Sequence, residues 1–208
     1  KQIVWKHHSK PYVPNSESGL SRSLLPEDAT SMFSEEANAY LTLYDIDDAL
    51  RERYNISYSP SQNRIIFPIY DNGELVSIEA RALGHSDEYK YITTGSKQNL
   101  FKTFEKPTSF VVLVEDIVSA IKVGQICPTI SLRGTACNRE KLYSILPLGR
   151  HFLIWLDGDK PGKKAAKELA RQIRTFYPVS LITTDRDPKC YSTERIKEII
   201  ERVYNDVC

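Results

Sequence analysis

The sequence lacks the features that define several large classes of protein. Its four cysteines include no C-x-x-C pair and have no histidine at zinc-ligand spacing beside them, so we expect no zinc site within the chain. Cysteines this sparse fit a reducing compartment, and we expect a cytoplasmic location, although an even number leaves a disulfide open. The longest apolar runs, such as 110–114, are far shorter than the ~20 residues of a membrane-spanning helix, and no secretory signal is visible. We therefore expect no membrane association.

An excess of charge of one sign is also missing. Lysine and arginine number 28 and aspartate and glutamate 27, which gives a net charge of +1; a surface that binds nucleic acid must therefore be local. The motif G-x-x-x-x-G-K-[ST] is absent, which excludes a P-loop motor within the sequence. The sequence starts at Lys1 rather than at a methionine, so an upstream portion is left open. The 208 residues, 41% of them hydrophobic and 26% charged, are typical of a protein with one large domain or two small ones.

Residues 1–106 predict an arm followed by a small α+β subdomain. Residues 1–26 are polar and rich in serine and proline, which is typical of an N-terminal arm or linker, and we interpret His7 and His8 there as solvated rather than metal-bound. Residues 27–106 predict helices and then a small antiparallel sheet. The expected elements are a helix with apolar residues from Ala29 to Leu41, a helix capped by 45–48 and running to about Tyr54, a hairpin of 64–70 and 74–81 around the turn 71–73, a strand at 89–92 and a loop at 93–96.

Residues 107–208 alternate between short apolar runs and amphipathic segments. The alternation occurs four times, which predicts a parallel sheet with helices on both faces. The boundary between the halves is expected near 105–107. The predicted strands are 110–114, 129–132, 152–156 and 179–183, and the predicted helices are 117–123, 139–146, 163–176 and 193–204.

Acidic residues follow three of these predicted strands. Glu115 and Asp116 follow the first, Asp157 and Asp159 the third, and Asp185 and Asp187 the fourth. Functional residues of a parallel sheet gather beyond the carboxyl ends of its strands, and carboxylates held close together call for a divalent cation such as Mg²⁺ or Mn²⁺. In Asp157-Gly158-Asp159, continued strand geometry would point both carboxylates the same way, and the glycine would leave room for a phosphate or a water. The alternative is a simple turn that starts a helix.

Lys160, Lys163 and Lys164 lie at the start of the helix that follows this turn. Backbone amides and the helix dipole favour anions at such a position. The lysines form either a solvated basic face or a binding site for a phosphate-bearing substrate.

Motifs in both halves resemble one known family. The second half resembles the TOPRIM domain, the metal-binding module of DnaG-type primases and of type IA and II topoisomerases, in VLVEDIVSA (112–120), SLRGTA (131–136) and LIWLDGDKPGKKAA (153–166). The first half resembles the RNA-polymerase core that precedes TOPRIM in bacterial and phage primases, and that topoisomerases lack, in RIIFPIYDNGELVSIEAR (64–81), YKYI (89–92) and NLF (99–101). The resemblance spans residues 27–204 and implies an α/β fold, a TOPRIM domain preceded by an α+β subdomain.

The resemblance implies roles for the matching residues. Carboxylates of the family hold one or two Mg²⁺ or Mn²⁺ ions, which neutralise triphosphate charge and activate the primer 3′-hydroxyl. Basic residues steer the phosphates of template and nucleotide. The matching catalytic residues are Glu115, Asp157 and Asp159, and the metal ligands are these three with Asp187. The nucleotide- or template-binding residues are Arg64, Arg81 and Lys90, to which we add Lys160 and Lys163. The alternative for Arg81 and Lys90 is a solvated strand face.

The sequence departs from the family's pattern at three positions. The glycine that usually follows the first glutamate is Asp116. The acidic residue often found four positions after that glutamate is Ser119, and a further acidic position after Asp187-Pro188 is Lys189. These departures are compatible with a single metal ion or a weakened enzyme. Asp116 or Asp185 is the candidate replacement ligand.

The sequence therefore predicts a primase catalytic core that makes short RNA primers on single-stranded DNA from ribonucleoside triphosphates. Short linkers favour the phage type, which would act in the host cytoplasm, and a replicative helicase, separate or fused, is the expected protein partner. Primases of this family usually carry an N-terminal zinc-binding module, which either precedes Lys1 or is dispensable here. Two alternatives stay open: a TOPRIM nuclease that uses the same carboxylates, and a non-catalytic nucleic-acid-binding domain in which Ser119 and Lys189 record lost chemistry.

Overall fold

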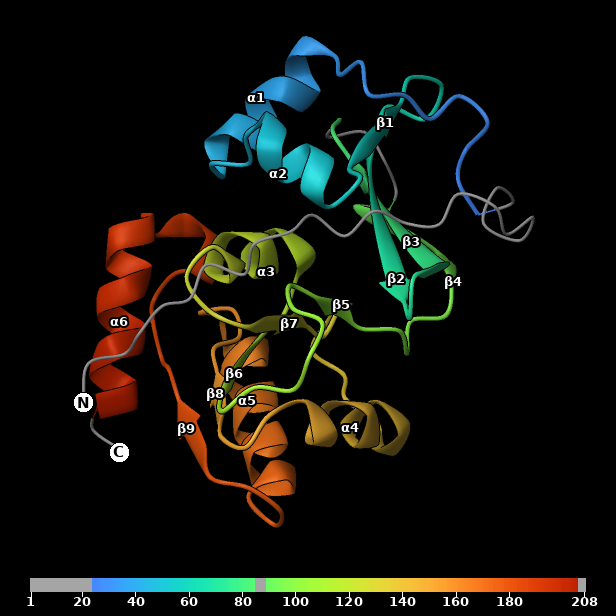
Figure 1. Cartoon of the computed structure of the whole chain (residues 1–208). Coiled ribbons are helices and arrows are strands. Elements are labelled where there is room, and N and C mark those ends of the chain that lie inside the picture. The colour runs from blue at the N-terminus through green and yellow to red at the C-terminus, as the bar shows by residue number, and fades with distance from the viewer. Residues whose placement is uncertain (1–23, 85–88, 206–208) are drawn as a thin grey trace. The chain divides into compact units, whose positions relative to one another are not determined.

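The computed structural model describes residues 24–84 and 89–205, which fall into two compact units. The division lies between Asn99 and Leu100. We call residues 24–99 the N-terminal unit and residues 100–205 the C-terminal unit (Figure 1). The histidine pair His7 and His8 and the expected arm up to residue 23 lie outside the described residues. In the described ranges, every helix is too short or too polar to cross a bilayer.

Two short helices begin the N-terminal unit, as predicted. α1 spans Glu35–Leu43 and α2 spans Asp48–Arg53. The first helix starts later than its apolar spacing indicates, because Ser34 is extended and its side chain accepts a hydrogen bond from the Ala37 amide at 3.2 Å. Asp47 caps α2 in the same way, accepting from the Leu50 amide at 2.9 Å. A side-chain cap satisfies an amide that has no partner within the helix, so it fixes where the helix begins.

A four-stranded antiparallel sheet completes this unit. Its strand order is β1-β2-β3-β4, with β1 at Ser57–Ser59, β2 at Arg64–Asp71, β3 at Glu74–Ala82 and β4 at Tyr91–Gly95. The predicted β2–β3 hairpin is confirmed, and the positive φ angles of Asn72 and Gly73 (47° and 89°) are those of the tight turn that the Asn-Gly pair favours. The loop expected at 93–96 is wrong, since β4 pairs with β3 as far as Gly95.

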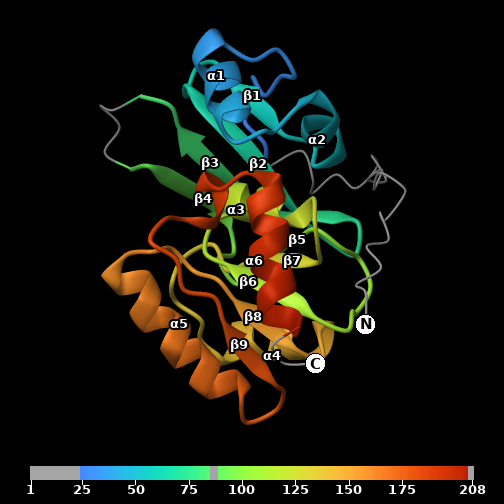
Figure 2. The ribbon, with the colours of Figure 1, turned by 90° about the vertical axis from the view of Figure 1, so that its left-hand side faces the viewer.

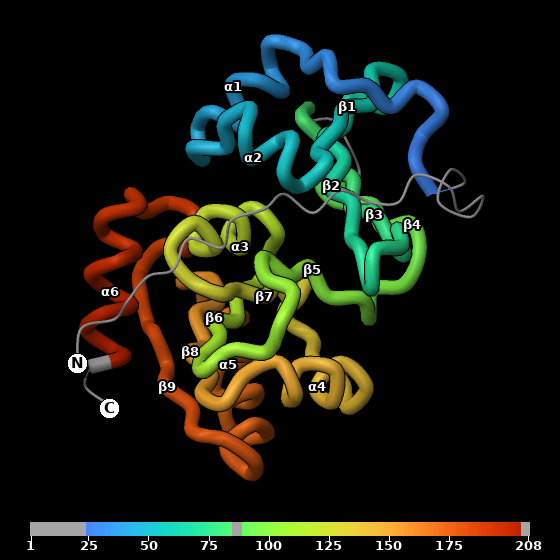
Figure 3. The backbone as a smooth tube through the Cα atoms, in the orientation of Figure 1, coloured from blue at the N-terminus to red at the C-terminus, as the bar shows by residue number. Residues whose placement is uncertain are grey.

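The C-terminal unit is built on a five-stranded sheet of order β5-β7-β6-β8-β9. The strands are β5 (Phe101–Lys102), β6 (Val111–Val114), β7 (Thr129–Ser131), β8 (Phe152–Ile154) and β9 (Val179–Leu181). β6 to β9 are parallel, which confirms the predicted parallel sheet, whereas β5 pairs antiparallel with β7. Strand β5 has two residues, too few for an apolar pattern to announce it. Figure 3 traces the alternation of strands and helices along the backbone.

Four helices cover the two faces of this sheet: α3 (Ile117–Gly124), α4 (Arg139–Ile145), α5 (Lys160–Ile173) and α6 (Thr193–Asn205). α4 and α5 share one face, where Leu142 and Leu169 join Leu113 and Phe152 in one buried cluster. α3 and α6 lie on the other face, as Figure 2 shows from the β9 edge. Helices on both faces bury β6, β7 and β8 completely, which explains their continuous apolar runs.

Candidate active site

Three neighbouring strands of the C-terminal unit end at one edge of the sheet, and acidic residues follow each of them. β6, β8 and β9 are adjacent and parallel, so their carboxyl ends meet at the same edge. The residues that raise the pKa of Glu115, of Asp157 or of both include Asp116, Asp159 and Asp187. The structure therefore brings together the four predicted metal ligands with Asp116. We call Glu115, Asp116, Asp157, Asp159 and Asp187 the acidic cluster.

Glu115 is fixed through its backbone by the turn after β7. The Glu115 carbonyl accepts hydrogen bonds from the Gly134 amide at 3.0 Å and from the Ser131 hydroxyl at 3.2 Å. The turn bends through Arg133, whose φ of 56° is in the left-handed region, and Gly134, whose φ of 129° suits glycine. The SLRG motif thus positions the glutamate. The Oε2 atom of Glu115 is buried and has no hydrogen-bond partner.

The Asp157-Gly158-Asp159 segment lies beyond the end of β8 at Ile154, and the backbone bends at Gly158 and Asp159. A Cβ atom on Gly158 would lie 2.7 Å from the carbonyl carbon of Asp185 and 2.9 Å from the Arg186 nitrogen. The backbone after β9 therefore occupies the place that a Cβ atom would need, which requires glycine here, and the interpretation that Gly158 leaves room for a phosphate or a water stays a prediction. The Oδ1 atom of Asp157 is buried and, like Glu115 Oε2, has no hydrogen-bond partner.

Asp159 does not continue the strand but caps helix α5. Its Oδ1 accepts a hydrogen bond from the Gly162 amide at 2.7 Å. This cap moves the helix start to Lys160, three residues before the predicted start at Lys163. A Cβ atom on Gly162 would collide with the carbonyl oxygen of Asp157. Both glycines of the DGDKPG motif are thus required by close backbone approach.

Lys189 supplies the positive charge inside the acidic cluster. It lies in the short 3₁₀ helix η3 (Pro188–Cys190), and its ammonium donates to Asp116 Oδ2 at 2.8 Å and to Asp187 Oδ2 at 3.0 Å. Asp116 also accepts from the amide and the hydroxyl of Ser119, at 2.9 and 2.8 Å. Asp116 is thus engaged by other side chains. Asp185, the other candidate replacement ligand, accepts instead from the Tyr191 hydroxyl at 2.8 Å.

The electrostatics of the cluster follow from burial and from mutual repulsion. Burial, then the charges of Asp116, Glu115 and Asp187, raise the pKa of Asp157 to about 7, against the opposing effect of Lys189. The pKa of Glu115 is raised for the same reasons, with burial the largest. Burial alone would lower the pKa of Lys189, but its two ion pairs more than compensate and raise it. One ammonium does not balance this many carboxylates.

The acidic cluster fits a hard divalent cation that substrate helps to bind. Within residues 24–84 and 89–205, no group of three or more His, Cys, Asp or Glu side chains is placed to hold a metal ion by itself. Glu115 and Asp157 nevertheless each present a buried carboxylate oxygen without a partner, and a cation would satisfy both. Mg²⁺ typically uses one or two protein carboxylates and completes its shell with water and substrate phosphates. The donor set matches that mode of binding.

Basic side chains follow the acidic cluster along helix α5. The predicted residues Lys160 and Lys163 are exposed and line a shallow groove that Lys164, Lys167 and Arg171 extend. Asp185 has a lowered pKa, chiefly through its hydrogen bond from Tyr191 and to a smaller degree through the charge of Lys163. The first turn of α5 thus carries cations close to the carboxyl end of the sheet, where an anionic ligand would be attracted.

In the N-terminal unit, two predicted basic residues lie against aromatic rings. The Arg81 guanidinium lies 5.1 Å from the centre of the Tyr40 ring and 5.2 Å from that of Tyr91, and it donates to the Tyr40 hydroxyl at 3.2 Å. The Lys90 ammonium lies 5.7 Å from the Tyr91 ring centre. Cation–π contacts restrict such side chains and prepare them for a phosphate or a base.

Arg64, the third predicted basic residue of this unit, is buried. Its guanidinium donates to the carbonyl of Ala80 at 3.3 Å and to that of Tyr89 at 3.0 Å. Arg64 therefore ties β3 to the segment that enters β4. Its assignment to nucleotide or template stays a prediction.

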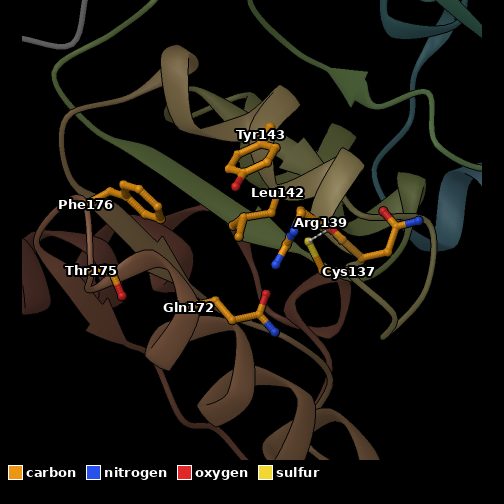
Figure 4. A pocket seen from close by; sticks show the side chains of 8 residues that line it. Cys137, Arg139, Leu142, Tyr143, Gln172, Thr175 and Phe176 are labelled. Atoms are coloured by element: carbon orange, nitrogen blue, oxygen red, sulfur yellow. Dashed lines mark hydrogen bonds between the residues drawn. The ribbon is translucent and has the colours of Figure 1, made fainter.

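A surface pocket lies at the opposite end of α5 from the acidic cluster. Cys137, Leu142, Tyr143 and Phe176 are among its lining residues (Figure 4). Helix α5 has 14 residues and is about 20 Å long, and the pocket lies at its C-terminal end, where Gln172 is one of the lining residues. This pocket is therefore separate from the candidate active site.

Sequence comparison links the chain to bacterial DNA primases. None of the protein-family profiles matches it. It is 27% identical over 123 residues to a DNA primase of Legionella pneumophila, an alignment that covers 52% of this chain and 21% of the relative. A DNA primase of Pseudomonas aeruginosa is 28% identical over 123 residues, with 52% and 18% covered. The chain thus spans about a fifth of the length of these curated relatives.

Structure comparison extends the similarity to most of the chain. The zinc-binding and RNA polymerase domains of Aquifex aeolicus primase superpose with a TM-score of 0.70 at 19% identity, covering 83% of this chain and 56% of that one. The DnaG catalytic core gives 0.66 at 15% identity, covering 81% and 73%. The chain has the fold of the DnaG-type primase catalytic core. The primase fragment of the bacteriophage T7 primase-helicase shares this fold, with a TM-score of 0.61, 18% identity, and 79% and 73% coverage.

The comparisons confirm the resemblance to DnaG-type primases and the α/β fold class expected from the sequence. Sequence reasoning missed the part that Lys189 plays in this primase fold, since it treated this lysine only as a lost acidic residue. The contact with Asp116 joins positions 73 residues apart. The available signal was the simultaneous gain of an acid at 116 and a base at 189.

Proposed function

We propose that the chain is the catalytic core of a DNA primase, which synthesises short RNA primers on single-stranded DNA by divalent-metal-dependent nucleotidyl transfer. The observation that carries the proposal is the pair of buried, unpartnered carboxylate oxygens of Glu115 and Asp157. They lie at the carboxyl edge of a sheet whose fold is that of primase cores. Buried polar atoms without partners are costly and indicate an absent ligand.

Glu115, Asp157 and Asp159 are the proposed catalytic residues, and these three with Asp187 are the proposed ligands for Mg²⁺ or Mn²⁺. When bound, such a cation supplies charge neutralisation for the triphosphate and activation of the primer 3′-hydroxyl. Glu115 and Asp157 each offer the cation a buried carboxylate oxygen that has no hydrogen-bond partner. Asp159 fixes the turn between β8 and α5 by capping the helix. Asp187 stays attached to the cluster through Lys189.

Basic residues in both units are the proposed contacts for nucleotide and template. Arg81 and Lys90 in the N-terminal unit, with the expected contribution of Arg64, and Lys160 and Lys163 in the C-terminal unit provide cations for phosphate oxygens. A DnaG primase catalytic domain of this fold has been solved bound to single-stranded DNA. The proposed partners are accordingly single-stranded DNA, ribonucleoside triphosphates and a separate or fused replicative helicase.

The proposed setting is DNA replication in a bacterial cytoplasm, with a phage as the favoured source. The fold is shared with the T7 primase fragment as well as with bacterial primase cores, so the phage assignment rests on the short linkers of the sequence. T7 primase domains have also been solved on an RNA/DNA hybrid.

A primer-synthesis assay tests the proposal. The chain is supplied with single-stranded DNA, ribonucleotides and Mg²⁺ or Mn²⁺, and labelled RNA products are separated by size. We expect short RNA from the wild-type chain and a loss of at least 100-fold in Asp157→Asn, since charge-stabilising active-site groups contribute about that much or more. Glu198→Gln, an exposed change on α6, is the matched control and keeps full activity.

Two other outcomes contradict the proposal. Cleavage of the DNA without RNA synthesis, abolished by Asp157→Asn, indicates a nuclease. Binding of DNA with neither reaction indicates a non-catalytic domain.

A further inference from the structure

Lys189 is held inside the acidic cluster rather than at its surface. Its side chain is only 12% exposed, and its two partners, Asp116 and Asp187, are 13% and 34% exposed. The distances of 2.8 and 3.0 Å are those of charge-assisted hydrogen bonds. An ammonium this enclosed is a fixed part of the cluster.

Asp116 is built to hold this ammonium. It caps α3, with its Oδ1 on the Ser119 amide and its Oδ2 shared between the Ser119 hydroxyl and Lys189. Ser119 is fully buried, so its hydroxyl has little freedom to turn elsewhere. Ser119, Asp116 and Lys189 therefore form one connected network.

These same three positions are the ones at which the sequence departs from the pattern of the primase family. Acidic residues are lost at 119 and 189, while an acid is gained at 116 and a base at 189. The net charge of the three positions is therefore 0, against −2 for the family pattern, a difference of two units. Two charges are the charge of one divalent cation, and the three departures contact one another.

In the described part of the chain, Glu115 and Asp157 of the cluster are not hydrogen-bonded to Lys189. No hydrogen bond joins Lys189 to Glu115 or Asp157 among the contacts of the described residues, and both carboxyl groups keep a buried oxygen without a partner. Apart from Asp159, which caps α5, the cluster thus divides into a pair that the ammonium hydrogen-bonds, Asp116 with Asp187, and a pair that only its charge reaches, Glu115 with Asp157.

We infer that Lys189 is a built-in cation that takes the place of one metal ion, so that the chain binds a single divalent cation, at Glu115 and Asp157. The inference rests on the proposed function for its assignment of the cluster to metal binding. It goes further in fixing the number of ions and the residue that determines it, and it assigns Asp187 to Lys189 rather than to the metal ion. Lys189 acts here as a positioning residue, through Asp116 and Asp187.

Counting bound Mn²⁺ tests the inference without any primer synthesis. The full chain, without nucleotide or template, is titrated with Mn²⁺ while electron paramagnetic resonance measures the free ion. Crystals soaked in Mn²⁺ locate the sites by anomalous scattering. We expect one ion per wild-type chain, beside Glu115 and Asp157, and none in Asp157→Asn.

Three substitutions at one position separate charge from ligation. Lys189→Arg keeps a cation and is expected to bind one ion, as is the surface control Glu198→Gln. Lys189→Asp replaces the cation with a carboxylate and is expected to bind two ions. Lys189→Gln removes the charge with little change in size, and because a nearby positive charge no longer repels the ion, its Mn²⁺ affinity is expected to rise on the order of tenfold.

Several results would overturn the inference: two ions in the wild-type chain, none in the wild-type chain, or an unchanged count and affinity in both Lys189→Asp and Lys189→Gln. Thermal unfolding verifies that each variant is folded, and Lys189→Gln remains informative if Lys189→Asp fails to fold. The proposed function fails separately. If the chain binds one Mn²⁺ ion but makes no RNA, the proposed function of primer synthesis is contradicted, whereas the inference that Lys189 replaces one metal ion still holds.

Discussion

At the scale of single residues, Asp157 carries the clearest consequence of the unbalanced charge. Burial and the neighbouring carboxylates raise its pKa from 3.8 to about 7. The folded chain therefore holds a proton on Asp157 that the unfolded chain has released between about pH 4 and pH 7. A carboxyl group whose pKa is higher in the folded state destabilises that state as the pH rises, so Asp157 lowers the stability of the metal-free chain progressively from about pH 4, and the loss is complete above about pH 7.

We predict that Asp157→Asn stabilises the metal-free chain at pH 8 relative to pH 4.5. The raised pKa would correspond to several kcal/mol of folding free energy if Asp157 were fully shielded from solvent. Since Asp157 is partly exposed, we expect the free energy of unfolding to rise by on the order of 2 kcal/mol. Urea unfolding in the presence of a chelator, at a series of pH values, measures the difference between variant and wild type.

The control for this experiment is Asp185→Asn, the other aspartate in this region with a shifted pKa. Its pKa is lowered, chiefly by the hydrogen bond from the Tyr191 hydroxyl, so its contribution to stability is lost only as the pH falls below about 4. The difference between this variant and the wild type should stay constant from pH 5 to pH 8. A profile for Asp157→Asn that is equally flat would contradict a raised pKa at this carboxyl group.

At the scale of elements, the start of helix α5 combines a structural and an electrostatic task in one side chain. Asp159 caps the helix through the Gly162 amide and also contributes charge to the cluster, where it raises the pKa of Glu115. Asparagine is as good a cap as aspartate but carries no charge. The two tasks can therefore be separated by substitution.

We predict that Asp159→Ala lowers the free energy of unfolding by about 1 kcal/mol, because the first turn of α5 loses its cap, whereas Asp159→Asn leaves it nearly unchanged. Both variants are expected to bind Mn²⁺ more weakly than the wild type, since both remove a negative charge. Chemical denaturation and Mn²⁺ titration of the two proteins measure these effects. Equal stability of the two variants would show that the cap does not hold the turn.

The elements that the sequence predicts are those with a long apolar or amphipathic pattern. The β2–β3 hairpin and the alternation of strands with helices in the C-terminal unit follow from local residues and are confirmed. Strand β5 has only two residues and strand β1 is Ser-Tyr-Ser, so neither shows an apolar run that would identify it. The predicted start of α5, at Lys163, was wrong because the helix begins at the residue after its cap, Asp159, and the apolar pattern contains no information about a cap.

The acidic cluster was predictable as a set but not in its internal contacts. Parallel strands deliver Glu115, Asp157 and Asp187 to one edge whatever the side chains do there. Which of them pairs with Lys189 depends on how the chain returns after β9, and the Lys189–Asp116 contact spans 73 residues. Likewise, only the packing of residues 185–186 shows why position 158 requires glycine, since their backbone lies where a Cβ atom would be.

At the scale of the whole molecule, a net charge of +1 conceals a separation of charge. The acidic cluster and the lysines of α5 belong to the C-terminal unit, while Arg81 and Lys90 belong to the N-terminal unit. The metal-binding and phosphate-binding tasks proposed for the chain are therefore assigned in part to different units. Substitutions in one unit should then leave the measured property of the other unchanged.

We predict that Arg81→Gln weakens single-stranded DNA binding and lowers its salt dependence without changing the count of bound Mn²⁺. Each phosphate contact on single-stranded nucleic acid contributes about 0.7 to the slope of log K against log salt concentration, so the slope should fall by about that amount. Fluorescence anisotropy at several salt concentrations measures it. Arg139→Gln, which changes an exposed arginine of the C-terminal unit at the pocket beside the end of α5, is the matched control and should keep the wild-type slope. If both variants lost the same slope, the effect would come from overall charge, and the stacking of Arg81 between Tyr40 and Tyr91 would have no special part in binding.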